Sequence, residues 1–489
     1  MTLRIENGGR VDLGTFLEID ADDLRRRMLE DLAAGARLSA FFGRPVAENR
    51  IELMAVLANS ATGLFHMYRA TAEDSFPSLT PDAPQAHWFE RELSEQAGLR
   101  IVGHPWLKPI RFNTPGATPG VTDYFRVEGE EVHEVAVGPV HAGVIEPGHF
   151  RFQCHGERVF HLEISLGYQH RGVERALKGG PDKRTIHYAE TASGDTSIGH
   201  ALAYSEAVET LANASVPARG EAIRSIALEL ERLANHTGDL GALAGDVAFL
   251  PTASFCGRLR GDFLNMTARI CGSRLGRGLA RPGGVGFDID DRMREELLAS
   301  LDSAEKDVTS AAELLFDTPS VAARFEETGT VSRETALAIG LVGPAARACG
   351  LERDARFEFP TGLFRFTHIP LSTWHSGDVF ARAYVRWLEI QRSIAFVREQ
   401  LQNLPEGPVR AAVGVLAPNA MTVSLVEGWR GEICHVALTD QSGKFAHYKI
   451  VDPSFHNWFG LAMSLRDQQI SDFPLCNKSF NLSYCGHDL

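Results

Sequence analysis

Short apolar runs alternate with amphipathic stretches over the first hundred residues, which predicts a small α+β unit. Residues 22–34 place apolar side chains at helical spacing, and the runs IELMAVLA and GLFHMYRAT flank the turn NSATG. This order is typical of a helix followed by two strands joined by a turn. Residues 83–99 predict a second helix that ends at Gly98, because glycine tolerates the left-handed conformation of a helix C-terminus.

The pattern changes after residue 112. Between residues 113 and 130 the chain carries Thr-Pro-Gly twice, and such turns interrupt regular structure. We therefore predict a linker at 113–130, which separates a unit at 1–112 from a larger unit at 131–489.

The larger unit begins and ends with strand-like runs and is helical between them. Apolar stripes at three- and four-residue steps predict long helices over 219–240, 291–316 and 378–402. Strand-like runs lie at 131–143 and 149–168, and again at 411–417, 421–428, 432–440 and 445–452. The predicted fold class is α+β, with a central bundle of long helices and flanking strands.

Composition narrows the class of protein. A chain of 489 residues exceeds the usual size of one core, and its net charge of −14 without basic clusters argues against a nucleic-acid partner. It has no run of eighteen apolar residues, and its start lacks the order of a signal peptide, so we expect a cytoplasmic protein. Seven scattered cysteines make a disulfide framework unexpected and are typical of buried thiols.

Several spaced motifs resemble the peripheral arm of respiratory complex I. WFERE (88–92) and GHPWLKP (103–109) are similar to its small subunit. GPVHAGVIEPGHFRF, LGYQHRGVERAL, AIRSIALELERLANHTGDLGAL, GRGLARPGGVGFDI and VEGWRGE follow in family order. These resemble the hydrogenase-like large subunit of the same complex, and more closely the membrane-bound energy-converting [NiFe] hydrogenases, in which the two units are fused.

The resemblance implies a nickel pocket whose ligands this chain lacks. In the hydrogenases two C-x-x-C pairs hold nickel, because soft thiolates suit that metal. Ser193 and Thr196 stand at the first pair. Ser483 and Gly486 stand at the second, and Cys485 lies one residue out of step. We expect the nickel–iron centre to be absent and predict Ser193, Thr196, Ser483 and Cys485 as the residues that line its former place.

Complex I uses the same pocket to bind a quinone between a histidine and a tyrosine. The resemblance puts Pro147 and the region of Gly194 at those places, with His141 and His149 close by. Quinone reduction at the usual pair is therefore in question. A quinone and a small soluble oxidant both stay open as the electron acceptor.

Titratable residues remain in the segments that converge on the pocket in the family. The predicted catalytic residues are Glu146, Asp195, His200, Arg347, Asp354, His170 and Arg171. His487 and Asp488 are further titratable residues of these segments. Glu146 matches the glutamate that the hydrogenases use for proton movement. A carboxylate buried beside a redox centre gains proton affinity, so electron arrival would be compensated by proton uptake.

Simpler interpretations stand beside these. The segment GDTSIGH is also a plain helix start capped by Asp195, Thr196 or Ser197, and Arg347 with Asp354 is also a structural ion pair. Cys485 is typical of a buried apolar thiol. Asp195, His200, His487 and Asp488 would suit zinc, manganese or iron if they converged, although no metal ligand is predicted.

The main hypothesis is a large subunit of a complex I-like, hydrogenase-related oxidoreductase without nickel. It would be peripheral to the cytoplasmic face of the inner membrane, beside ion-pumping subunits. A partner small subunit would hold the [4Fe–4S] cluster, since this chain has no four-cysteine ligand set. The alternatives are a [NiFe] hydrogenase with unusual ligands and a structural assembly subunit without catalysis.

Overall fold

A computed structural model of the chain describes residues 2–114, 116–141, 143 and 145–489. The first predicted Thr-Pro-Gly turn and the end of the predicted strand at 131–143 include Pro115 and Ala142, which lie outside the described residues. Val144, in the loop that carries Glu146, also lies outside them.

The N-terminal unit is a sheet covered by two helices. Its strands follow the order β1-β6-β5-β4, and β3 pairs with β6 in parallel. The predicted turn between 59 and 63 is confirmed, because β5 and β6 pair antiparallel on either side of it. Gly98 has φ 72° and ends α2, as predicted. The elements are β1 (Leu3–Glu6), β2 (Arg10–Asp12), β3 (Glu18–Asp20), α1 (Ala21–Ala33), β4 (Arg37–Ala47), β5 (Arg50–Asn59), β6 (Leu64–Ala72), β7 (Ser75–Pro77), α2 (His87–Ala97) and β8 (Arg100–Val102).

Two further sheets belong to the larger unit. Strands β9 (Val132–Val137), β10 (His149–His155) and β11 (Arg158–Ser165) form one of them. The other has the order β16-β15-β14-β2, with β14 (Ala420–Gly428), β15 (Gly431–Thr439) and β16 (Phe445–Val451). Strand β2 comes from the N-terminal unit, so the two units share this sheet. A buried ion pair of 2.6 Å between Lys449 and Glu92 joins them a second time.

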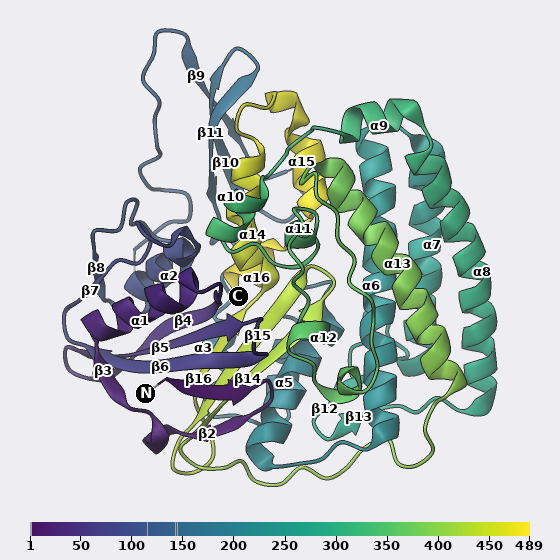
Figure 1. Ribbon diagram of the computed structural model, residues 1–489, viewed down its shortest axis with the longest axis horizontal. Coiled ribbons are helices and arrows are strands. Elements are labelled where there is room, and N and C mark those ends of the chain that lie inside the picture. The colour runs from purple at the N-terminus through teal and green to yellow at the C-terminus, as the bar shows by residue number, and fades with distance from the viewer. Residues whose placement is uncertain (1, 115, 142, 144) are drawn as a thin grey trace.

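Four long helices form the predicted bundle, which lies beside the β16-β15-β14-β2 sheet (Figure 1). They are α6 (Ala218–Asp246), α7 (Leu250–Cys271), α8 (Asp291–Phe316) and α13 (Val379–Gln402). The stripe predicted for 291–316 is buried at Leu297, Leu301, Ala304, Val308, Ala311 and Leu315. The sequence pattern did not single out α7, which carries Gly257 and Gly261 among charged residues.

One predicted strand is wrong. Residues 411–417 run as an extended segment that forms no strand, and its backbone meets its neighbours only at isolated points, such as Ala411 N to Gly283 O and Ala417 N to Leu211 O. Val415 is 85% exposed, so the apolar run of this segment follows the surface instead of entering a sheet.

Short helices connect these layers. They are α3 (Val173–Leu177), α4 (Thr185–Glu190), α5 (Ser197–Ala212), α9 (Pro319–Phe325), α10 (Arg333–Ala338), α11 (Gly343–Arg347), α12 (Ala355–Glu358), α14 (Pro453–Ser464), α15 (Phe473–Phe480) and α16 (Tyr484–Asp488). Two-residue strands β12 (Ala280–Arg281) and β13 (Gly284–Val285) and single turns η1 (Leu13–Thr15), η2 (Pro84–Ala86), η3 (Gly362–Arg365) and η4 (Ile470–Asp472) complete them. Within the described residues, none of the helices has the length and apolar character that a membrane crossing requires.

Candidate functional site

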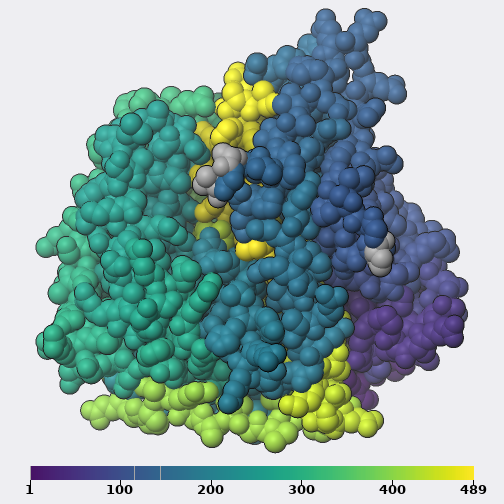
Figure 2. Space-filling model, turned by 180° about the vertical axis from the view of Figure 1, so that it is seen from behind, coloured from purple at the N-terminus to yellow at the C-terminus, as the bar shows by residue number. Residues whose placement is uncertain are grey.

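The two chain segments predicted to form one pocket lie against each other. Ser193 and Thr196 directly precede α5, and Ser483 caps α16 in the C-terminal tail. The Ser193 hydroxyl donates to Ser483 Oγ at 2.9 Å, although 290 residues separate them. Figure 2 shows the tail, in yellow, between the helical bundle and the segment that carries β9–β11. We call Ser193, Asp195, Thr196, Ser483 and Cys485 the cradle.

A carboxylate from another helix fixes the start of α5. The sequence predicts a local cap from Asp195, Thr196 or Ser197, yet Thr196, the N-cap residue, makes no capping bond with its side chain. Glu231 on α6 takes this role, because its carboxylate accepts from Ile198 N at 2.7 Å and Gly199 N at 3.1 Å. Burial raises the pKa of Glu231 to about 8.

Asp195 carries the charge of the cradle. Arg430, in the hairpin turn between β14 and β15, donates to both carboxylate oxygens at 2.5 and 2.8 Å. Burial acts to raise the pKa of Asp195, but the Arg430 guanidinium holds it below its ordinary value. The Asp195 side chain is 34% exposed, so the cradle opens beside this carboxylate. The motif VEGWRGE contained Arg430, but its distance of 235 residues from Asp195 hid the pairing.

The cradle offers one thiol. Cys485 Sγ lies 3.4 Å from Ser483 Oγ, and burial, with the carboxylate of Glu146, raises the pKa of this thiol to about 11. Cys476 lies elsewhere, on α15 beside Gly329. Because a nickel–iron centre needs several thiolates, the hydroxyls of Ser193, Thr196 and Ser483 with one protonated thiol do not fit it.

Gly486 stands where the hydrogenases have their fourth nickel-binding cysteine, and another side chain fills the space beside it. A Cβ at Gly486 would lie 2.7 Å from Asp452 Cγ, so the carboxylate of Asp452 occupies the space that a side chain would need. Nor do the harder groups converge, because His487 faces Asp488 and His200 faces Asp452. Within the described residues, no three His, Cys, Asp or Glu side chains are arranged to hold a metal ion.

Glu146 lies beside Cys485 of the cradle. Its Oε2 accepts from Tyr484 N at 3.3 Å, which links the loop after β9 to the tail. Tyr484 also lines a mostly apolar cavity of about 430 Å³, together with His141, Asp246 and Lys478. This volume suits a small organic ligand.

The positions of the complex I quinone pair are altered. His141 and His149 bond to the carbonyls of Gly148 and Gly138 within their own loop, at 2.9 and 3.3 Å. A Cβ at Gly194 would meet no described residue within 4 Å, so the described part of the structure leaves the region expected for the tyrosine open. Tyr484 reaches the cavity from the tail instead, and no sequence motif singled it out.

His170 and Arg171 hold the tail. Arg171 donates to the carbonyls of Thr191, Ala192 and Cys485 at 2.6, 2.8 and 3.1 Å, and so ties the tail to the segment before Ser193. His170 Nδ1 lies 2.8 Å from the Asp488 carbonyl oxygen. These predicted catalytic residues contact the backbone that builds the cradle.

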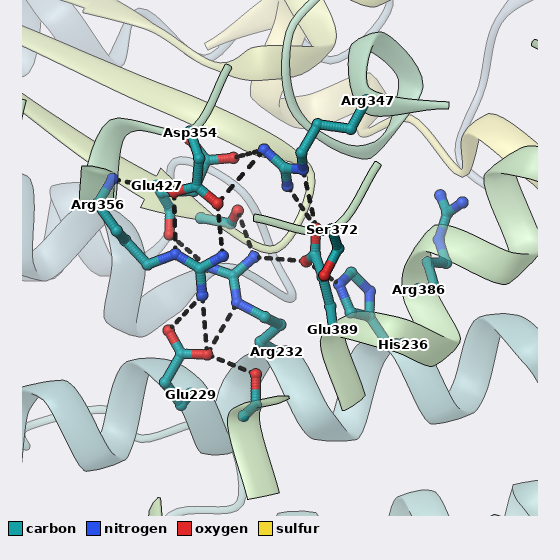
Figure 3. A network of polar contacts seen from close by, with 12 residues as sticks. Glu229, Arg232, His236, Arg347, Asp354, Arg356, Ser372, Arg386, Glu389 and Glu427 are labelled. Atoms are coloured by element: carbon teal, nitrogen blue, oxygen red, sulfur yellow. Dashed lines mark hydrogen bonds and ion pairs between the residues drawn. The ribbon is translucent and has the colours of Figure 1, made fainter. Parts of the chain in front are cut away.

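Arg347 and Asp354 lie in a separate buried cluster (Figure 3). Arg347 donates to Glu389 at 2.6 Å and to Glu427 at 2.7 Å, and its Nη1 is 3.6 Å from Asp354. We call Glu229, Arg232, His236, Arg347, Asp354, Arg356, Glu389 and Glu427 the network. Among the described residues, neither Arg347 nor Asp354 bonds directly to a cradle residue.

Comparisons with known proteins agree on one group. The family model of the respiratory-chain NADH dehydrogenase 30 Kd subunit matches residues 5–120, and that of the 49 Kd subunit matches residues 246–419. Hydrogenase-4 component G of Escherichia coli is 31% identical over 431 residues, which cover 84% of this chain and 75% of that protein. An NADH-quinone oxidoreductase subunit of Clostridium beijerinckii is 30% identical over 337 residues, 68% of this chain and 91% of that one.

A solved structure supports the same fold. A chain of the membrane-bound sulfane sulfur reductase, described as an archaeal respiratory membrane complex, superimposes with a TM-score of 0.69 at 23% identity. The match covers 73% of this chain and 99% of that one.

Proposed function

Because this chain belongs to the family of complex I-like and membrane-bound hydrogenase subunits, we propose that it is the large subunit of a nickel-free oxidoreductase of this family. It receives electrons from the [4Fe–4S] cluster of a partner small subunit and passes them to an acceptor beside the cradle. The complex couples this transfer to proton or ion movement through membrane subunits, at the cytoplasmic face of the inner membrane.

The hydrogen bond of 2.9 Å between Ser193 and Ser483 carries this proposal. It keeps the two segments of the family's metal pocket together with hydroxyls where thiolates would stand. A protein that had lost the redox site and kept only an assembly role would not need to keep this closure beside a cavity of about 430 Å³. The cavity is the place for the acceptor, a quinone or a small soluble oxidant.

Residues at the cradle provide for charge and protons. The Asp195–Arg430 pair sets a fixed dipole at the opening, and a dipole that is already oriented stabilises charge that develops during reduction. Glu146 lies between Tyr484 and Cys485, where a carboxylate can pass a proton toward the reduced acceptor. The thiol of Cys485 stays protonated, because its pKa lies near 11.

Rapid mixing of the intact complex tests the proposal. The partner cluster is reduced first, and its reoxidation by candidate quinones and soluble oxidants is followed spectroscopically. We expect Asp195→Asn and Glu146→Gln to slow reoxidation or the coupled ion movement by about tenfold or more. Asp467→Asn, which removes an exposed ion pair with Arg158, is the matched control and should leave both unchanged.

The outcomes separate the alternatives. Reoxidation that is insensitive to both cradle variants would identify a structural assembly subunit. Stoichiometric nickel in the purified complex would instead revive a hydrogenase with unusual ligands.

A further inference from the structure

A chain of four buried polar groups starts beneath the cradle and leads away from it. Asp452 caps α14, His200 lies on α5, His435 on β15 and Tyr448 on β16. His200 Nε2 is 3.0 Å from Asp452 Oδ2, and His200 Nδ1 is 3.0 Å from His435 Nε2. His435 Nδ1 is 2.9 Å from the Tyr448 hydroxyl. The three side chains beyond Asp452 are fully excluded from solvent.

The protonation states of these four groups orient their three hydrogen bonds in one direction. Burial holds the pKa of His435 well below its ordinary value, so this imidazole is neutral, with one donor and one acceptor nitrogen. Burial acts to raise the pKa of Asp452, but the hydrogen bond from His200 keeps it lowered, so the carboxylate accepts. With His200 donating to Asp452, its other nitrogen accepts from His435, which in turn accepts from Tyr448. Every bond then points toward Asp452.

The inner end of the chain meets the cradle. The Asp452 carboxylate lies directly against Gly486, three residues after Ser483. Arg430, which pairs with Asp195, also acts on the Asp452 charge. Asp452 therefore contacts the same tail helix that closes the cradle.

The outer end approaches an exposed loop. The ring of Tyr448 lies 6.1 Å from that of Tyr204, centroid to centroid. The Tyr204 hydroxyl is 2.6 Å from Thr185 Oγ1, and Thr185 Oγ1 donates to the Asp182 carbonyl at 2.9 Å. Asp182 is exposed, so the Tyr204–Thr185 pair reaches the surface. Tyr204 and Tyr448 pack ring against ring, and among the described residues no direct hydrogen bond joins their hydroxyls.

We propose that Asp452, His200, His435 and Tyr448 form a proton relay between the cradle and the exposed loop at Asp182, with Tyr204 and Thr185 at its outer end. Asp452 takes the Nε2 proton of His200. His200 in turn takes the Nε2 proton of His435 at its own Nδ1, and His435 takes the hydroxyl proton of Tyr448 at its own Nδ1. Solvent at the exposed loop supplies the replacing proton, which the Thr185 and Tyr204 hydroxyls pass inward by turning, and a water molecule between the Tyr204 and Tyr448 hydroxyls completes its return to Tyr448. The net result is one proton moved inward, no change of oxidation state in the relay, and both imidazoles in the other neutral tautomer.

This inference rests on the proposed function, because reduction at the cradle is what consumes the proton. A route of this kind is separate from Glu146, which approaches the cradle from the loop after β9. Its connection to solvent can be measured without turnover.

The first test measures exchange in the intact complex. After transfer to D₂O, infrared bands of ¹⁵N-histidine are followed, and the difference from His435→Gln assigns the relay. We expect the imidazole N–H of the relay to exchange within the mixing time despite full burial, and Thr185→Val or Tyr448→Phe to slow this at least about tenfold. Exchange over hours in the unaltered complex, as for core amides, would overturn the relay.

The second test measures use of the relay during turnover. Tyr448→Phe should lower the turnover of the complex about tenfold and increase its solvent deuterium isotope effect, since proton transfer becomes limiting. Tyr68→Phe removes a comparable hydroxyl that donates to Asp31 at 2.7 Å, and it should change neither quantity. Fast exchange with unaltered turnover and isotope effect would show a connected chain that the reaction does not use, which refutes the proposal. A failure of the proposed function alone would appear as cradle variants without effect while the exchange result stands.

Discussion

The cradle and the network are both polar and mostly buried, yet they are built in opposite ways. In the network, four carboxylates face three guanidinium groups and a histidine, and each carboxylate is bonded to at least one of them. The cradle has short hydroxyls, one thiol, a glycine neighbour and a single ion pair. Compensated charges fix a shape, whereas small neutral groups leave room for a ligand and a proton.

Two glutamates on α6 show the same contrast within one helical turn. Glu229 faces the network, where burial acts to raise its pKa but Arg232 and Arg356 hold it below the ordinary value. Glu231 faces the cradle side, accepts only two backbone N–H groups among the described residues, and has a pKa raised to about 8 by burial. The neighbouring cations decide which carboxyl is charged at neutral pH.

The largest expected effect comes from removing a charge in the network. Glu389→Gln leaves Arg347 and Arg232 without the carboxylate they share, and breaking a buried pair in this way costs about 3–5 kcal/mol. Although burial acts to raise it, Arg347 keeps the pKa of Glu389 well below its ordinary value, so the charge contributes stability at neutral pH. The free energy of unfolding of the full chain, measured by urea titration, checks this.

Glu305→Gln is the control for that measurement. Glu305 pairs with Arg398 at the surface, where its side chain is 43% exposed, so the loss should stay below about 1 kcal/mol. Equal losses for the two variants would contradict the view that the network supports the shape of the site.

A smaller loss of stability is expected from Gly486→Ala, a substitution beside the cradle at a position where a charged side chain already fills the space. In Gly486→Ala the new Cβ would lie 2.7 to 2.9 Å from the Asp452 carboxyl atoms, and overpacking of this kind costs about 1–3 kcal/mol. Alanine favours a helix over glycine by at most about 1 kcal/mol, so we expect a net loss of roughly 1–2 kcal/mol.

Gly194→Ala is the matched control within the same site. Its Cβ would meet none of the described residues within 4 Å, so the free energy of unfolding should change by no more than about 0.5 kcal/mol. If Gly486→Ala were equally neutral, Asp452 would not fill the former ligand place.

The sequence predicted the elements that have a long local hydrophobic pattern and the residues that stand in family motifs. The prediction at 291–316 has the bounds of α8, and every residue of its apolar stripe except the partly buried Met293 is buried, because a long amphipathic helix repeats its signal over about seven turns. The run at 411–417 misled, since a short apolar run reads as a strand whether or not a partner strand exists.

At the cradle, the resemblance brought Ser193 and Ser483 together. It did not reveal Arg430, Asp452 or Glu231, because their partners lie 32 to 252 residues away and no local spacing records such contacts. Arg347 and Asp354 matched a family segment equally well, yet their side chains face the network. Family motifs contain both the cradle residues and the network residues. Only the direction of their side chains, which tertiary packing decides, separates the cradle from the network.

The pair on α6 provides the finest test of the comparison. A carboxyl with a raised pKa binds a proton more tightly in the folded chain than in the unfolded one, so its folded state loses stability as pH rises from about 4.5 toward 8. Glu231→Gln removes this proton and should make the slope of stability against pH less negative, by at most about 1.4 kcal/mol per pH unit. Glu229→Gln should act in the opposite sense, because a lowered pKa contributes stability that is lost as pH falls. Urea titrations of the two variants and the unaltered chain between pH 3 and 8 compare the slopes, with the effect of Glu229→Gln expected below about pH 5 and that of Glu231→Gln above about pH 4.5. Identical slopes for all three over the whole range would mean that the two sides of α6 do not differ electrostatically.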